Sequence, residues 1–221
     1  VMGYSWERSA EVGRPASGEG GMDLVSGVLI SRDEGMTWLP GGDCRADTAR
    51  SPDALPHATN GIDEPAIVAL AEDDLFLLGR TGTHNLWQSF SHDGGMTWCP
   101  PIPSPLCSHN CPAALLRLAN GNVMVVYNDD PLHRVNLCVR VSDDGCRTWS
   151  SAHRVAAIGD TSEEVQAAYP NACQLMDGTI VVVFYHVARG NSSTPHSIVA
   201  VRFPPEMLEK TGCPSDGSAT E

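Results

Sequence analysis

One eight-residue phrase occurs three times in the chain, and it restricts the possible folds more than any other feature. It runs from Ser to Trp at 31–38, 91–98 and 142–149, and the copies start 60 and 51 residues apart. All three copies share Ser, Asp, Thr and Trp at the same positions. Asp and Gly favour a tight hairpin, in which the carboxylate accepts hydrogen bonds from backbone N–H groups and Gly takes a positive φ. Repetition at intervals of this size predicts a repeat architecture built from similar units.

Short apolar segments typical of β-strands fill the intervals between the copies. They lie at 24–30, 65–70, 75–78, 86–90, 113–118, 123–127, 135–141, 172–175, 180–185 and 197–201. Turn signals such as Asn120-Gly121 and Asp177-Gly178 separate them. No segment shows sustained helical periodicity, so the sequence predicts an all-β fold.

The composition excludes two classes of partner. The formal net charge is −13, whereas binding to nucleic acid or to an anionic lipid surface requires a basic footprint. No stretch approaches the roughly 20 apolar residues of a membrane span. The sequence therefore predicts no nucleic-acid partner and no membrane span, and it leaves the cellular location open.

The eight Cys residues do not indicate a metal site. Cys107, His109 and Cys111 are metal-ligating residue types, but their spacing matches no standard zinc pattern and no second pair follows. Cys138 and Cys173 stand inside apolar strand-like segments, so we expect both to be buried free thiols. We expect neither a metal nor an organic cofactor.

The repeated phrase resembles the Asp-box of sialidases and related β-propellers, where the box joins the third and fourth strands of a blade. This resemblance implies four-stranded antiparallel blades arranged in a six-bladed propeller of the sialidase type. At about 50 to 60 residues per blade, 221 residues supply about four blades. We therefore expect two blades upstream of Val1, a partial propeller over 1–203 and a flexible C-terminal tail over 204–221.

Four residues between the boxes resemble the sialidase site in the order Glu, Arg, Arg, Tyr. Glu64 opens the segment Glu-Pro-Ala-Ile-Val, and Arg80 follows 16 residues later. Arg134 stands before an Asn-Leu strand, where its position at the strand start favours it over Arg140. Tyr169 lies in an Ala-Tyr-Pro segment ahead of a hairpin. The resemblance implies that Tyr169 and Glu64 are catalytic and that Arg80 and Arg134 bind the substrate carboxylate.

The chemistry of sialic acid explains this set of residue types. Its anomeric carbon carries a carboxylate, which repels a carboxylate nucleophile but not a neutral phenol, and sialidases accordingly use Tyr. A phenol with a pKa near 10 requires a neighbouring base, which would be Glu64 for Tyr169. Arg80 and Arg134 would hold the carboxylate through forked hydrogen bonds. The resemblance thus implies an exo-α-sialidase that removes sialic acid, or a related 2-keto sugar acid, from sialylated or other acidic glycans with retention.

Other interpretations of the same residues remain open at this stage. Glu64 could be a carboxylate at a hairpin entry, Arg80 a solvated strand end and Tyr169 an aromatic ring packed under Pro170. The family's first carboxylate-binding Arg and its acid/base Asp have no match, so we expect the chain alone to hydrolyse glycosides weakly or not at all. One alternative is a non-catalytic Asp-box propeller that binds a glycan or a protein. Another is a propeller that acts on other acidic sugars, such as uronates.

Overall fold

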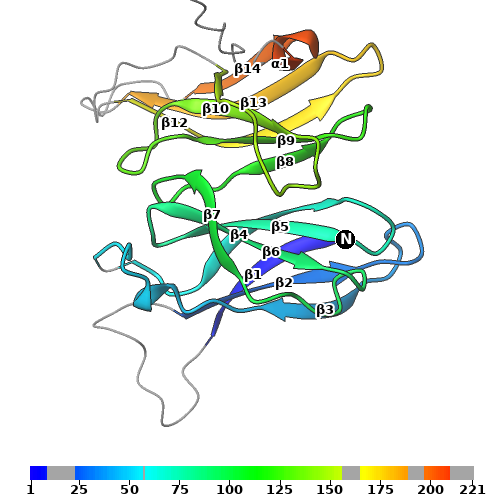
Figure 1. Cartoon of the computed structure of the whole chain (residues 1–221), viewed down its shortest axis with the longest axis vertical. Helices are drawn as coiled ribbons and strands as arrows, with labels where there is room; N and C mark the ends of the chain where they lie inside the picture. The colour runs from blue at the N-terminus through cyan, green and yellow to red at the C-terminus, as the bar shows by residue number, and fades with distance from the viewer. Residues whose placement is uncertain (9–22, 57, 156–164, 189–196, 210–221) are drawn as a thin grey trace, which may run out of the picture.

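Four antiparallel β-sheets follow one another along the chain in a computed structural model, which describes residues 1–8, 23–56, 58–155, 165–188 and 197–209 (Figure 1). The first two sheets contain β1 (Met2–Arg8), β2 (Asp23–Ile30), β3 (Leu39–Cys44), then β4 (Ile62–Ala69), β5 (Leu75–Thr81), β6 (Asn85–Ser91) and β7 (Ile102–Cys107). The last two contain β8 (Ala114–Arg117), β9 (Val123–Asn128), β10 (Leu137–Ser142), β11 (His153–Arg154), then β12 (Val165–Gln174), β13 (Ile180–Ala188) and β14 (Ser197–Phe203).

The all-β prediction is confirmed, and each of the ten predicted strand segments lies on a strand. Helical structure in the described residues is limited to a 3₁₀ turn, η1 (Thr48–Arg50), and one short helix, α1 (Glu206–Glu209). Strands β1, β3, β7 and β11 were not predicted. Strands β3 and β7 each contain Pro and lie at the edge of their sheets, where a missing N–H is tolerated but the strand pattern is obscured. The two middle sheets have four strands, whereas the first and last have three within the described residues.

The three boxes form the same turn between the last two strands of the first three sheets. In each box the Ser hydroxyl donates to the Asp carboxylate at 2.8–2.9 Å. The Thr donates to that carboxylate twice, through its backbone N–H at 2.8–3.0 Å and through its hydroxyl at 2.5–2.6 Å. The shared Ser, Asp and Thr therefore make one closed hydrogen-bond set that holds the turn.

Cys146 takes the place of Gly in the third box without altering the turn. Its φ is +67°, close to the +90° of Gly35 and the +94° of Gly95. Its N–H donates to the hydroxyl of Ser142 at 2.8 Å, as the corresponding Gly residues do in the other boxes. The Cys146 side chain is fully buried between the second and third sheets, so its packing offsets part of the cost of a left-handed backbone.

Adjacent sheets pack face to face through three apolar clusters. Ile62, Leu77 and Trp87 lie in the cluster between the first and second sheets. Phe76 and Tyr127 belong to the cluster between the second and third sheets. Met124, Val126, Ile180 and Phe184 lie in the cluster between the third and fourth sheets. Two of the box Trp residues, Trp98 and Trp149, pack against these clusters, whereas Trp38 is 42% exposed.

The first residues of the predicted tail pack onto the fourth sheet. Helix α1 follows β14 directly, and Leu208 on it is buried in the cluster between the third and fourth sheets. Residues 210–221, the remainder of the predicted tail, lie outside the described residues. The packed structure thus continues beyond β14 into helix α1.

One of the two predictions of buried thiols is wrong. Cys138 is buried, but Cys173 is exposed, because it points to the opposite face of β12 from Ala172, which packs against the cluster between the third and fourth sheets. The seven described Cys residues are all free thiols. Among the described residues no helix is long and apolar enough to cross a membrane.

Protonation of the box carboxylates predicts a change in acid stability. Hydrogen bonds from Thr97 lower the pKa of Asp93 to about 2, so the folded state keeps this charge after the unfolded chain has been protonated. The resulting stabilisation is present above about pH 4 and is lost as the pH falls toward 2. We expect Asp93→Asn to show a shallower fall in Tm between pH 4 and pH 2, measured by circular dichroism. Asp53→Asn, outside the boxes, is the control, and equal slopes in all three proteins would contradict the prediction.

Candidate active site

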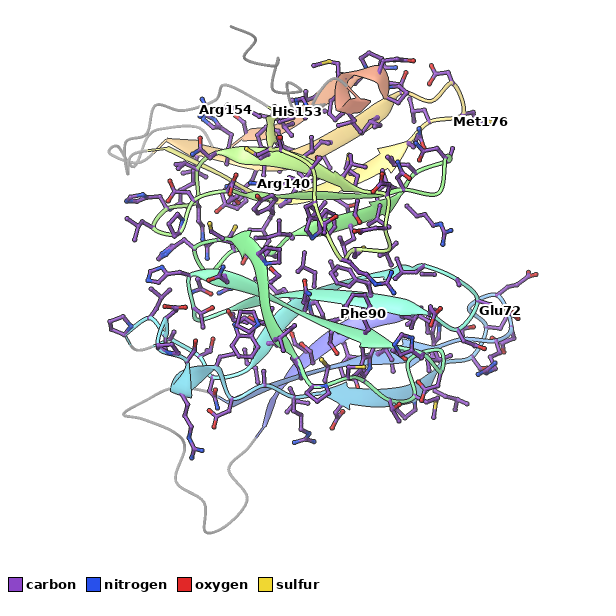
Figure 2. The ribbon with its side chains drawn as sticks, in the orientation of Figure 1. Glu72, Phe90, Arg140, His153, Arg154 and Met176 are labelled. Carbon is purple, nitrogen blue, oxygen red and sulfur yellow. The ribbon has the colours of Figure 1, made fainter. Side chains whose placement is uncertain are left out.

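The strands that carry Glu64 and Tyr169 run toward the same edge of the molecule. Glu72 follows β4 and Met176 follows β12, and Figure 2 shows both labelled residues at one edge. Glu64 and Tyr169 each lie five residues before the last residue of their strand, which is Ala69 in β4 and Gln174 in β12. Two residues that are 105 positions apart in the sequence are therefore brought to corresponding places in the second and fourth sheets.

Both residues stand at irregularities of their strands. The pairing of β4 with β5 shifts between Asp63 and Ala66, and the pairing of β12 with β13 shifts between Ala168 and Asn171. At these bulges Glu64 has a φ of +46° and Tyr169 a φ of +53°, and each is followed by Pro. Positive φ is uncommon for such residues and costs about 1–3 kcal/mol. Bulges re-aim side chains, and these two direct a carboxylate and a phenol toward one guanidinium.

That guanidinium belongs to Arg80 on β5. Its Nη1 donates to Oε2 of Glu64 at 2.7 Å and to the phenol oxygen of Tyr169 at 3.1 Å. Burial would lower the pKa of Arg80, but the hydrogen bond and the negative charge of Glu64 raise it. Arg80 therefore stays charged and holds the carboxylate and the phenol together.

The phenol of Tyr169 is kept in its neutral form. Burial raises its pKa, and the negative charge of Glu64 and a hydrogen bond with that carboxylate raise it further, while Arg80 and Arg134 act in the opposite direction. The ring is still 42% exposed, so it is accessible from solvent. A phenol that donates to a carboxylate is poised to lose its proton to that group when it attacks an electrophile.

Arg134, and not Arg140, lies beside Tyr169. The Arg134 guanidinium is 5.7 Å from the centre of the Tyr169 ring, which also stacks on Tyr185 at 5.6 Å. Arg140 instead donates to the hydroxyl of Tyr127 at 2.7 Å and to Asp129 at 3.1 Å (labelled Arg140 in Figure 2). The structure thus brings Glu64, Arg80, Arg134 and Tyr169 together and leaves Arg140 in a separate network.

Asn128, for which the sequence predicted no role, supports this arrangement. Asn128, at the end of β9, is fully buried, and its amide nitrogen donates to the carbonyl oxygens of Val135 at 2.9 Å and Ala167 at 2.7 Å. Its amide oxygen accepts a hydrogen bond from the thiol of Cys111 at 3.0 Å. One side chain therefore fixes the residue after Arg134 and a residue two positions before Tyr169. Only its polar character at the end of an apolar strand signals such a role in the sequence.

Cys111 and His109, which are metal-ligating residue types, form hydrogen bonds with other groups of the protein. The Cys111 thiol is bonded to Asn128, and burial raises its pKa to about 11. His109 pairs through Nδ1 with the carbonyl oxygen of Pro131 at 3.2 Å. Within the described ranges no group of three His, Cys, Asp or Glu side chains is arranged to hold a metal ion.

A shallow apolar hollow adjoins the phenol of Tyr169. Its volume is about 390 Å³, and Tyr169, Val183, Phe184, Tyr185 and Ile198 line it. Tyr169 thus lines this hollow as well as contacting Arg80.

Comparisons with known proteins place this geometry in context. The sequence matches the family described as BNR repeat-like domain over residues 8–182. No curated protein matches the sequence. A protein of unknown function from Dyadobacter fermentans has 21% identity and a TM-score of 0.61, over 82% of this chain and 46% of that chain.

Two sialidase structures have the same fold as the chain. The NanB sialidase of Streptococcus pneumoniae has 16% identity and a TM-score of 0.60, over 83% of this chain and 27% of that chain. The Trypanosoma rangeli sialidase has 17% identity and a TM-score of 0.56, over 84% of this chain and 29% of that chain. The chain thus spans less than half the length of each of these three structures. The shared fold confirms the predicted sialidase-type β-propeller architecture.

The buried amide of Asn128 predicts a large effect on stability. Asn128→Ala leaves the carbonyl oxygens of Val135 and Ala167 without their donor, and each unpaired buried acceptor costs about 1–3 kcal/mol. We expect the free energy of unfolding, measured with urea, to fall by about 2–4 kcal/mol. Asn120→Ala, in an exposed turn, should change it by less than about 1 kcal/mol. Equal effects of the two substitutions would contradict the role of Asn128.

The pairing of Glu64 with Tyr169 predicts a shift in the titration of the phenol. Removing the charge of Glu64 in Glu64→Gln removes one cause that raises the pKa of Tyr169, so the phenol should ionise at lower pH than in the wild type. Ultraviolet difference titration measures this, with Tyr169→Phe identifying the signal of Tyr169. Glu72→Gln, in the turn after β4, removes a carboxylate that does not act on Tyr169 and is the control. A Tyr169 pKa that is unchanged in Glu64→Gln would show that the two groups do not interact.

Proposed function

This chain belongs to the BNR repeat-like domain family, and on that basis we propose that it carries part of the active site of an exo-α-sialidase-type glycoside hydrolase. The proposed substrates are glycans ending in sialic acid or a related 2-keto sugar acid. The observation that supports it most directly is the three-way contact among Glu64, Arg80 and Tyr169. These are the residue types that the chemistry requires, supplied by three different strands.

Tyr169 is the proposed nucleophile and Glu64 its base. Glu64 accepts the phenol proton as the phenol oxygen forms a bond to the anomeric carbon, and the bond from that carbon to the leaving oxygen breaks. The leaving oxygen takes a proton from an acid. A water molecule then displaces Tyr169, giving one proton to the conjugate base of that acid, while Tyr169 recovers its own proton from Glu64. Two displacements at the same carbon retain the anomeric configuration.

The two arginines are the proposed binding site for the substrate carboxylate. Arg80 donates from Nε and Nη1 to protein groups, and no described residue accepts a hydrogen bond from its Nη2. Arg134 also contacts Tyr169, with its guanidinium 5.7 Å from the ring centre. A carboxylate beside the phenol would therefore meet two guanidinium groups, which bind such a group more tightly than ammonium groups do.

The acid that protonates the leaving oxygen is not among the four residues of the proposed site. General acid catalysis contributes about 10²–10⁴-fold to the rate. A substrate with an aryl leaving group needs little protonation, whereas a natural glycoside needs much. The residues of this chain should therefore favour an activated sialoside over sialyllactose.

Removing the nucleophile provides the direct test. We expect Tyr169→Phe to lower turnover of an aryl sialoside by at least about 10²-fold, because Phe cannot form the covalent bond. Release of the fluorescent aryl group measures the rate, and Tyr4→Phe on β1 is the matched control, which should keep the wild-type rate. Equal and measurable rates for Tyr169→Phe and wild type would exclude Tyr169 as the nucleophile. Sialic acid binding that depends on Arg80 without any turnover would instead favour a glycan-binding propeller.

A further inference from the structure

Asn110 contacts both arginines of the proposed site through two different atoms. It lies in the loop between β7 and β8, and its side-chain Oδ1 accepts a hydrogen bond from Nε of Arg80 at 2.6 Å. Its backbone carbonyl oxygen accepts one from Nη2 of Arg134 at 3.0 Å. Arg80 is 30 residues and Arg134 is 24 residues away in the sequence, so Asn110 connects β5 with the loop between β9 and β10.

The backbone conformation at Asn110 allows both contacts. Its φ is +41°, a left-handed conformation that Asn tolerates better than most residues. The next residue, Cys111, is buried and bonded to the fully buried Asn128. The loop is therefore held from one side by the core and presents two oxygen atoms to the other side.

The contact also determines which nitrogen atoms of Arg80 remain for other groups. A guanidinium is planar with five N–H donors, so a bond at Nε fixes the direction of the remaining four. With Nε on Asn110, Nη1 reaches Glu64 and Tyr169. Asn110 is neutral, so it orients the two cations without competing with an anionic ligand for their charge.

We propose that Asn110 is the positioning residue that sets the orientation and spacing of Arg80 and Arg134 for a single carboxylate. This inference rests on the proposed function for its ligand but not for its geometry. Two substitutions test the side chain of Asn110 separately from its backbone carbonyl group. Asn110→Gly keeps the left-handed backbone and the carbonyl bond to Arg134, and removes only the acceptor for Arg80. Asn110→Asp keeps that acceptor and adds a negative charge beside both arginines.

A close control exists within the same region of the structure. Asn136 also has a left-handed backbone, with a φ of +53°, and its Oδ1 accepts a hydrogen bond from Nη2 of Arg154 at 2.6 Å. Asn136→Gly thus removes a similar bond to an arginine outside the site. Thermal melts by circular dichroism establish that each variant is folded before it is compared.

The first measurement is the NMR signal of the Arg80 Nε–H group in the full chain without ligand, assigned by its loss in Arg80→Lys. We expect this signal to shift in Asn110→Gly and to stay in place in Asn136→Gly. The second is calorimetric binding of N-acetylneuraminic acid and of its methyl ester, which lacks the carboxylate charge. Asn110→Gly and Asn110→Asp should each lose about tenfold or more in affinity for the acid, with little change for the ester.

The outcomes distinguish this inference from the proposed function. An unchanged Arg80 Nε–H signal in Asn110→Gly, or an unchanged preference for acid over ester in that variant, overturns the role of Asn110. A wild-type chain that binds acid and ester equally overturns the proposed function. In that case the Nε–H signal still decides whether Asn110 positions Arg80.

Discussion

The buried amide of Asn128 connects three segments that carry residues of the proposed site. Its nitrogen donates to the carbonyl oxygens of Val135 and Ala167, and its oxygen accepts from Cys111. Arg134, Tyr169 and Asn110 each lie one or two residues from one of these three contacts. Because a buried amide without partners is costly, the three segments keep one arrangement and the site is organised before a ligand arrives.

The site also holds strain that the surrounding sheets counteract. Glu64, Asn110 and Tyr169 all have left-handed backbones, and all three contact Arg80. Each such residue costs on the order of 1–3 kcal/mol, a cost that persists only where regular structure on both sides enforces it. Regular strand pairing flanks the bulges at Glu64 and Tyr169. Clustering of three strained residues around one guanidinium is typical of a functional site.

Most of the strands could be predicted because their apolar segments and turns are local features. The exceptions have physical causes: Pro hides the edge strands β3 and β7, and the bulge at Tyr169 hides the first half of β12. Burial was harder to predict than strand position. Cys173 and Trp38 are exposed although a strand residue and a box Trp elsewhere in the chain are packed, since burial depends on neighbouring sheets and not on the residue itself.

Local sequence was sufficient for the boxes, since Ser, Asp and Thr bond to one another within four residues wherever the phrase occurs. The order Glu64, Arg80, Arg134, Tyr169 could also be recognised from the chain alone. Tertiary structure decided that Arg134 and not Arg140 faces Tyr169, and it brought Asn110 and Asn128 into the site. Three of their hydrogen bonds join residues 24, 30 and 39 positions apart, so they depend on how whole sheets pack. A single asparagine carries no local pattern that encodes such packing.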